Sequence, residues 1–247
     1  MVSVPITGIS LRGIFEDPRN PNRMLSHLVR PLEATGRFRF TEFPVWGAGF
    51  GDYDRELDRV SAALAQHIRD HQGPLVGAGF SGGSHVWKRA MLRLSGDDRA
   101  KVIRLVLCAD PSMPRDLGYR DVANGYGDIM GSTLLALSGI AGAEQLWMPQ
   151  PSRVVYVADR GDPICCCPPG SPLRSLAAFL TSMGPDAGMP ARMRLKLVAA
   201  AVGRRYDLGA YAEANRLFGD YAFRGAHTRP YGPLLARVAD DLNRSIR

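Results

Sequence analysis

The chain has 247 residues, a length that suits one domain or one domain with a large insertion. Hydrophobic residues make up 45% of the chain and charged residues 22%, and these ordinary globular values exclude a collagen-like, coiled-coil or intrinsically disordered protein. The formal net charge is +7, but the basic residues are scattered rather than gathered in runs, so nucleic-acid binding is not the expected main function.

Patterns typical of strands and helices alternate along much of the chain. Apolar or alternating runs predict strands at 2–11, 38–43, 75–80, 102–108 and 153–157. Apolar residues at spacings of three and four predict helices at 22–34, 52–70, 84–94 and 233–246, with Asp52 placed to cap the second of them. Strands separated by helices favour right-handed crossovers, so we expect a mainly parallel central sheet.

The segment 171–225 differs in composition from the rest. It is rich in Ala, Leu, Met and Arg, shows no strand pattern and is interrupted by Pro185 and Pro190. We interpret it as a helical insertion within a single domain that spans 1–247. The chain has no run of the roughly 18 apolar residues that a membrane span needs, and its first residues lack the pattern of a signal peptide.

A G-x-S-x-G sequence, Gly79-Phe80-Ser81-Gly82-Gly83, stands between a predicted buried strand and a predicted helix. In that context it indicates a strand–turn–helix elbow, which lifts the serine hydroxyl above the sheet at the N-terminus of a helix. There, the helix dipole and free N–H groups favour developing negative charge. The alternative is a tight turn without chemistry.

The same stretch also fits the dinucleotide-binding pattern G-x-G-x-x-G through Gly77, Gly79 and Gly82. That pattern needs an acidic residue at the end of the next strand, where it reaches the ribose. Asp97 and Asp98 have nearly the right spacing, but they precede the next predicted strand. We therefore disfavour a dinucleotide site.

A serine nucleophile needs a base and a carboxylate that orients the base. His227 is the only histidine beyond residue 85, and it lies in a Gly/Pro-containing loop before the last predicted helix. Three acids follow the two strands after the elbow: Asp110, Asp159 and Asp162. We favour Asp162, because it lies far enough beyond its strand to turn inward, and keep Asp159 as the alternative.

Six short motifs in a fixed order together resemble the cutinase-like serine esterases, most closely the phage lysin B branch. They are Arg-Gly-Ile-Phe-Glu at 12–16, Phe-Pro-Val-Trp at 43–46, the elbow at 79–83, Asp-Pro at 110–111, Gly-Asp-Pro-Ile-Cys at 161–165 and His-Thr-Arg-Pro-Tyr at 227–231. Each motif is weak alone, but the ordered set covers nearly the whole chain.

The resemblance implies a three-layer α/β-hydrolase with Ser81, Asp162 and His227 as catalytic triad. It also implies an oxyanion hole formed by the backbone N–H groups of Gly82 and Ile14, with no metal or other cofactor. Lysin B enzymes hydrolyse the ester between mycolic acid and arabinogalactan in the mycobacterial envelope, and they carry a helical insertion before the histidine. The expected partner is thus a lipid ester, with neither nucleic acid nor stable membrane insertion.

The resemblance also implies synthesis in the host cytoplasm without a signal peptide and action at the envelope after release. Two other functions stay open: a general cutinase or lipase for shorter esters, and an inactive hydrolase-fold module that binds lipid or a partner. Each would retain the fold, and turnover and chain-length preference would distinguish them.

The chain departs from the family in several places. Gly82 replaces the usual glutamine after the nucleophile, and Ile14 stands where secreted cutinases place a hydroxyl that assists the oxyanion. Cys165 matches half of a family disulfide, but Ala158 stands where its partner is expected. The run Cys165-Cys166-Cys167 does not predict a metal site, because three adjacent residues rarely direct three sulfurs at one tetrahedral ion.

Overall fold

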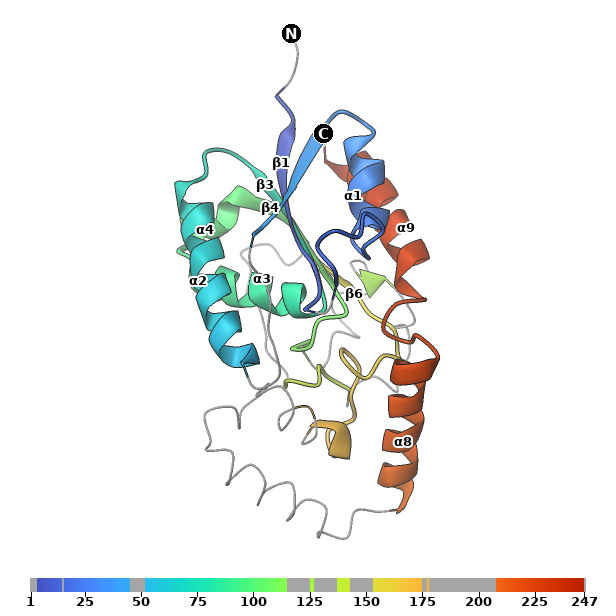
Figure 1. Cartoon of the computed structure of the whole chain (residues 1–247). Helices are drawn as coiled ribbons and strands as arrows, with labels where there is room; N and C mark the ends of the chain where they lie inside the picture. The colour runs from blue at the N-terminus through green and yellow to red at the C-terminus, as the bar shows by residue number, and fades with distance from the viewer. Residues whose placement is uncertain are drawn as a thin grey trace.

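A parallel β-sheet forms the centre of the molecule (Figure 1). The computed structural model describes residues 4–14, 16–44, 52–114, 125–126, 137–142, 153–174, 177 and 208–246. Six strands are hydrogen-bonded in the order β2-β1-β3-β4-β6-β5, and every described pairing is parallel. The strands are β1 (Ile6–Leu11), β2 (Phe38–Glu42), β3 (Leu75–Phe80), β4 (Val102–Cys108), β5 (Gly125–Tyr126) and β6 (Val154–Val157).

Helices cover both faces of the sheet and give the molecule three layers (Figure 1). One layer contains α2 (Tyr53–Asp70), α3 (Gly82–Leu92) and α4 (Gly96–Lys101), and the other contains α1 (Ser26–Glu33) and α9 (Tyr231–Ser245). The helix α8 (Leu208–Phe223) lies beyond the sheet, below α9 in the view of Figure 1. This is the three-layer α/β architecture that the family resemblance implies.

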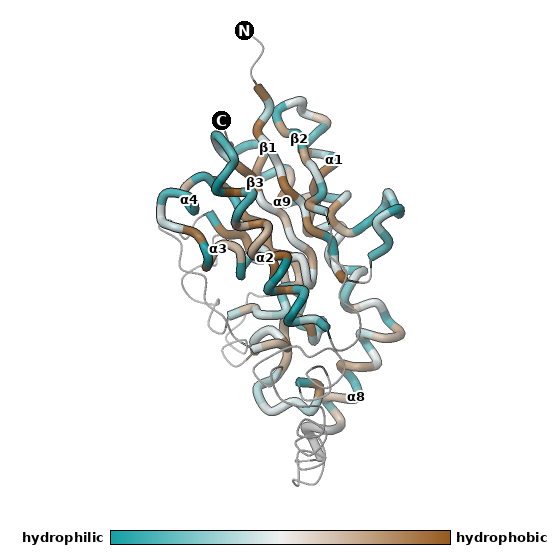
Figure 2. Tube along the Cα trace, turned by 60° about the vertical axis from the view of Figure 1, so that its left-hand side comes forward, coloured by the Kyte–Doolittle hydropathy of each residue, from teal (hydrophilic) through white to brown (hydrophobic). Residues whose placement is uncertain are grey.

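The apolar spacing of α2 matches the face that the helix buries. Leu57, Val60, Leu64 and Ile68 are almost fully buried and pack with α3 and the sheet in one core cluster. In Figure 2, short hydrophilic and hydrophobic stretches accordingly alternate along α2. Because burial of a Leu or Ile side chain contributes roughly 1.5–3 kcal/mol, this face rather than helix propensity holds α2 in place.

β3 lies in the middle of the sheet, and all six of its residues are buried. Its last pairs with β4 join Gly79 to Leu107 and Phe80 to Cys108, so the two strands end side by side. The segments that follow β3, β4 and β6 therefore meet at one edge of the sheet. In open parallel sheets, this carboxyl edge is where ligands bind.

Some predicted features differ in the structure. α4 and the two-residue β5 have no apolar periodicity, so the sequence does not predict them. Asp52 precedes α2 but makes no side-chain capping hydrogen bond; instead its carboxylate pairs with Arg55 at 3.0 Å. Within the predicted insertion 171–225, α8 is helical as expected, and positions 175–176 and 178–207 lie outside the described residues.

The motif at 43–46 is described only in its first half, because 45–51 lie outside the described residues. Among the described helices, none combines the length and apolar character needed to cross a membrane.

Candidate active site

Ser81 occupies the sharp turn between β3 and α3. Its backbone has φ 52° and ψ −122°, a conformation that non-glycine residues rarely adopt. The Ser81 N–H donates to the carbonyl of Cys108 at 2.8 Å, which fixes the turn to the end of β4. Strain of this kind persists only where the surrounding structure enforces it, and it is frequent at functional sites.

The glycines on either side of Ser81 permit close backbone approach. A Cβ at Gly79 would stand 2.6 Å from the backbone nitrogen of Ser84, and one at Gly83 would stand 2.2 Å from the carbonyl oxygen of Leu11. Both distances are far below van der Waals contact. The glycines of the G-x-S-x-G sequence are therefore required by packing of the elbow against itself and against the end of β1.

Asp162 and His227 meet at the same edge of the sheet. Asp162 lies in the loop after β6 and His227 in the loop between α8 and α9, and the Nδ1 atom of His227 is 2.8 Å from Oδ2 of Asp162. Asp162 is fully buried, and its Oδ1 atom accepts the backbone N–H of Ile164 at 3.0 Å. The carboxylate is thus held in place and directs the other ring nitrogen, Nε2, away from itself.

The other two candidate acids lie elsewhere. Asp110 forms a buried ion pair with Lys88 and accepts the N–H and hydroxyl of Ser112, each at 2.9 Å. Burial alone would raise the pKa of Asp110, but the charge of Lys88 holds that pKa below its usual range. Asp159 accepts the N–H of Gly161 at 2.8 Å within its own turn. Of the three acids, the structure places Asp162 against His227.

Gly82 and Ile14, the two residues expected to form an oxyanion hole, both line the cavity that Ser81 and His227 line. Gly82 is the first residue of α3, so its N–H is one of those that have no carbonyl partner within the helix. Ile14 lines the same cavity, in the loop after β1. The Glu16 carboxylate holds this loop, because it accepts the N–H of Gly13 at 2.8 Å and that of Met24 at 2.7 Å.

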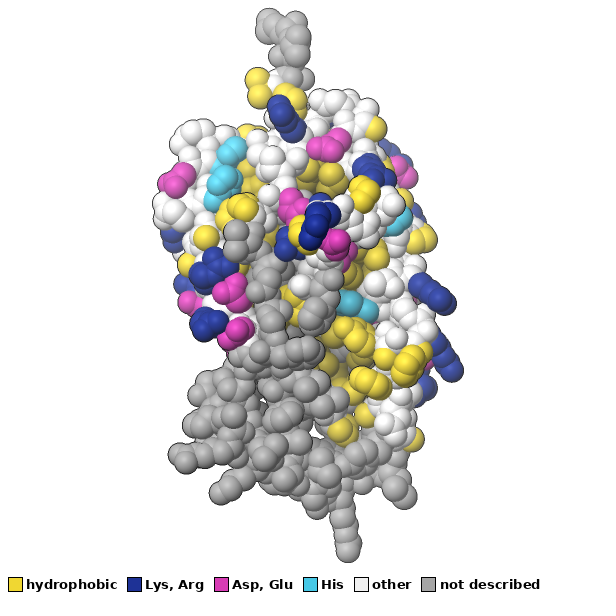
Figure 3. Space-filling model, viewed as in Figure 1, with side chains coloured by type: hydrophobic (Ala, Val, Ile, Leu, Met, Phe, Trp, Pro, Cys, Tyr) yellow, Lys and Arg dark blue, Asp and Glu magenta, His cyan; other side chains and the backbone are white. Residues whose placement is uncertain are grey.

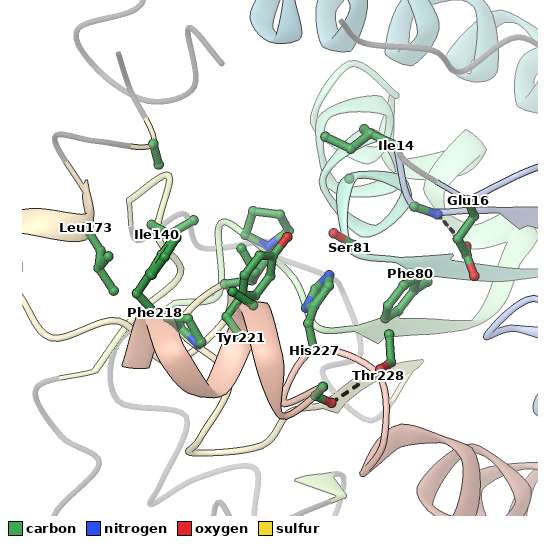
Figure 4. Close-up of a pocket in the computed structure, with 18 of the residues that line it drawn as sticks. Ile14, Glu16, Phe80, Ser81, Ile140, Leu173, Phe218, Tyr221, His227 and Thr228 are labelled. Atoms are coloured by element: carbon green, nitrogen blue, oxygen red, sulfur yellow. Dashed lines mark hydrogen bonds between the residues drawn. The ribbon is translucent and has the colours of Figure 1, made fainter. Parts of the chain in front are cut away.

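A largely apolar cavity of about 550 Å³ brings these groups together. Figure 4 shows Ser81 and His227 facing one space, with Ile14 beside Ser81 and with Phe218 and Tyr221 projecting from α8. On the face shown in Figure 3, hydrophobic side chains gather over α8 and next to it. Phe218 and Phe223 of α8 are exposed. The other apolar lining residues include Phe80, Pro111, Ile140, Pro163, Ile164, Leu173 and Ala222.

Tyr231 also belongs to this site, a position that its place in the sequence does not reveal. Its hydroxyl donates to Oδ2 of Asp162 at 2.6 Å, and its ring lies edge-on to Phe80, which in turn stacks on the His227 ring with centroids 5.0 Å apart. Its place in the motif at 227–231 was the available signal, but nothing in that motif shows which carboxylate the hydroxyl reaches.

His85 lies four residues after Ser81, close enough in sequence to be considered as a base. It is buried, and its Nδ1 atom lies 3.0 Å from the hydroxyl of Tyr53. Burial lowers the pKa of His85 to about 3, even though the charge of Asp110 acts in the opposite direction. Its proximity to the elbow in sequence therefore does not make it an alternative base near neutral pH.

All four cysteines are buried free thiols. The Cys165 sulfur is 3.3 Å from the Tyr231 hydroxyl and 3.7 Å from Asp162 Oδ2, and burial raises the pKa of this thiol well above its usual range. A thiol in this state is a poor nucleophile and a poor metal ligand. Within the described part of the chain, no three His, Cys, Asp or Glu side chains cluster as a metal site would require.

Comparisons with known proteins bear on the fold. No family model matches the chain, and no curated protein matches its sequence. A cutinase-like protein from Cryptococcus sp. has a similar structure, with a TM-score of 0.52 and 17% identity over 86% of this chain and 95% of that one. The chain has the α/β-hydrolase fold. An acetyl xylan esterase gives a TM-score of 0.48 with 14% identity over 81% of this chain and 97% of that one.

Proposed function

We propose that the protein is a serine ester hydrolase in which Ser81 is the nucleophile, His227 the base and Asp162 the residue that orients it. The observation that carries the proposal is that a strained Ser81 at a helix N-terminus and His227, which is paired with Asp162, line one apolar cavity. The cutinase-like protein of the same fold supports this class of chemistry.

The proposed reaction has two halves. Nε2 of His227 takes the proton of Ser81 while Oγ forms a bond to the acyl carbon, and the N–H groups of Gly82 and Ile14 stabilise the oxyanion. His227 then gives its proton to the leaving alcohol as the ester C–O bond breaks. Water, deprotonated by His227, attacks the resulting acyl-enzyme, and Ser81 leaves with the proton. Asp162 stabilises the imidazolium in both halves.

The finer proposal concerns the substrate. A cavity of about 550 Å³ with mainly apolar walls suits a long acyl chain better than a sugar or a charged group. Part of its wall comes from α8, which lies between the proposed acid and base in sequence, as the helical insertion of lysin B enzymes does. We therefore propose the mycolic acid–arabinogalactan ester as substrate, cleaved after phage-mediated release of the protein from the host cytoplasm.

The proposed esterase activity is tested by hydrolysis of p-nitrophenyl esters, from acetate to palmitate, by the wild type and by Ser81→Ala. Turnover that disappears in the variant supports a Ser81 esterase. A preference for long chains supports the lipid-ester proposal, whereas a preference for acetate or butyrate favours a cutinase for shorter esters. No turnover by a folded protein at any length would contradict the proposal and favour an inactive binding module.

The proposed mycolic acid–arabinogalactan substrate must be tested with the natural ester linkage. Purified mycolyl-arabinogalactan is incubated with wild type or Ser81→Ala, and free mycolic acid is extracted and quantified. Release by the wild type alone supports the envelope substrate. An enzyme that hydrolyses p-nitrophenyl palmitate but releases no mycolic acid would contradict this assignment and leave the esterase activity standing.

A further inference from the structure

We propose that Tyr231 is a positioning residue whose hydroxyl shares the Oδ2 atom of Asp162 with His227 and thereby sets the pH range in which His227 acts as base. The effect of Tyr231 on catalysis rests on the proposed function, in which His227 is the base. The contacts on which it depends are nevertheless structural and can be measured without turnover.

The Oδ2 atom of Asp162 has two donors at close range, and the Cys165 thiol donates to it more weakly from 3.7 Å. The Tyr231 hydroxyl lies at 2.6 Å and the His227 Nδ1 atom at 2.8 Å, whereas Oδ1 accepts the N–H of Ile164 at 3.0 Å. Tyr231 and Asp162 are both fully buried. Water therefore does not compete for these bonds, and each donor withdraws charge from an oxygen that the other also uses.

Tyr231 is fixed as a donor. Burial, followed by the nearby charge of Asp162, raises the pKa of its hydroxyl well above the usual value, so the proton stays on the tyrosine throughout the working range of an esterase. Its ring lies edge-on to Phe80 with centroids 6.1 Å apart, and Tyr231 begins α9. A phenylalanine at this position would retain the ring packing and lose only the oxygen.

The direction of the effect follows from charge. In the wild type, the Tyr231 hydroxyl neutralises part of the carboxylate charge that would otherwise stabilise protonated His227. Without the hydroxyl, Asp162 attracts the imidazolium more strongly, and the pKa of His227 rises. Because the base must be neutral to accept the Ser81 proton, the acid limb of the kcat/KM profile moves to higher pH.

Other titratable groups among the described residues lie around this cluster. The Cys165 sulfur lies 3.3 Å from the Tyr231 hydroxyl, and the Tyr221 ring on α8 lies 5.5 Å from the His227 ring. Cys108, at the end of β4, is close enough for its charge to act on Tyr231. Three further described groups are Glu16 on the cavity wall, Arg229 beside Gly225 in the histidine loop, and His27 of α1 beside Gly232.

Tyr231→Phe tests the proposal, with Cys165→Ala as the matched control that alters the same cluster but keeps the Tyr231 bond. The titration of His227 is followed by NMR of protein with labelled histidine, and the signal is assigned with His227→Gln. We expect the His227 midpoint to rise by about half a unit or more in Tyr231→Phe and much less in Cys165→Ala. The acid limb of kcat/KM should move by the same amount.

An unchanged midpoint in folded Tyr231→Phe would overturn the proposal, even if the protein is an active esterase. A shifted midpoint in a protein without esterase activity would support the Tyr231 contact and count against the proposed function instead. Should Tyr231→Phe fail to fold, 3-fluorotyrosine at position 231 serves instead. It is a stronger donor and should lower the His227 midpoint, and a rise or no change would overturn the proposal.

Discussion

Lys88 and Asp110 form an ion pair that is almost completely withdrawn from solvent between α3 and the loop after β4. The Lys88 ammonium also donates to the carbonyl of Ser112 at 2.7 Å. α3 begins directly after Ser81, and Pro111, which follows Asp110, lines the cavity. The ion pair therefore connects the elbow to another wall of the proposed site.

Removal of one partner of this pair should be costly, because the other charge stays buried. We expect Lys88→Met to lower the free energy of unfolding by about 3–5 kcal/mol in urea titrations. Arg93→Met is the control, since its pair with Asp58 is largely exposed and should be worth less than about 1 kcal/mol. Equal losses in the two variants would show that burial does not govern this pair.

His85 should make stability depend on pH. Its pKa is about 3 when folded and near 6.5 when unfolded, so between these values the unfolded chain binds one proton more. The free energy of unfolding should therefore fall as pH is lowered, with His85 contributing a slope of ~1.4 kcal/mol per pH unit. Urea titrations between pH 6 and 4.5 would measure this slope, above the range in which Asp110 takes up a proton.

The matched variants for that experiment are His85→Gln, which retains a partner for Tyr53, and His67→Gln on the exposed face of α2. The slope should decrease by most of the His85 contribution in the first variant and stay at the wild-type value in the second. A wild-type slope in His85→Gln would mean that the histidine is not buried in its neutral form.

Gly83 should not tolerate a side chain. In Gly83→Ala, the new Cβ would displace Leu11 or α3, so we expect a loss of about 1–3 kcal/mol in the free energy of unfolding and a lower kcat. In Gly219→Ala, no described atom outside α8 lies within 4 Å of the new Cβ, and a gain of roughly 0.5–1 kcal/mol is expected. Thermal unfolding of both variants compares their changes in stability. A Gly83→Ala variant as stable and active as the wild type would contradict this prediction.

Asp162 and Asp159 should differ sharply in activity. Asp162→Asn leaves His227 without its carboxylate, and we expect kcat to fall by about 10³–10⁴-fold. Asp159→Asn disturbs a local turn and should lower kcat by less than about tenfold. Both variants should bind a non-hydrolysable ester analogue normally, and the reverse ranking of kcat would reassign the acid.

The sequence was most informative where local pattern and tertiary burial coincide. The alternating strands and helices, the buried face of α2 and the elbow glycines all follow from spacing and from the lack of a Cβ. The favoured choice of Asp162 among three acids came from its distance beyond β6, which lets the chain turn inward toward the histidine loop.

The buried polar groups could not be predicted in the same way. His85 and Lys88 follow Ser84 on α3 by one and four residues, and nothing in the helix sequence indicates their partners. Only the folded sheet and α2 bring Asp110 to Lys88 and Tyr53 to His85. Similarly, Tyr231 and Asp162 are 69 positions apart, so their hydrogen bond is a property of the folded chain. Periodicity detects apolar faces, whereas partners for buried polar atoms depend on tertiary structure.

Labelling with a fluorophosphonate followed by peptide mapping identifies the nucleophile itself. We expect one adduct per chain, formed as Ser81 Oγ displaces fluoride from phosphorus, with no labelling of Ser81→Ala and strongly slowed labelling of His227→Ala. Ser84, which donates to the Cys108 carbonyl at 2.8 Å, should stay unmodified. An adduct on another residue, or none on the folded wild type while a known serine esterase reacts, would contradict Ser81 as the nucleophile.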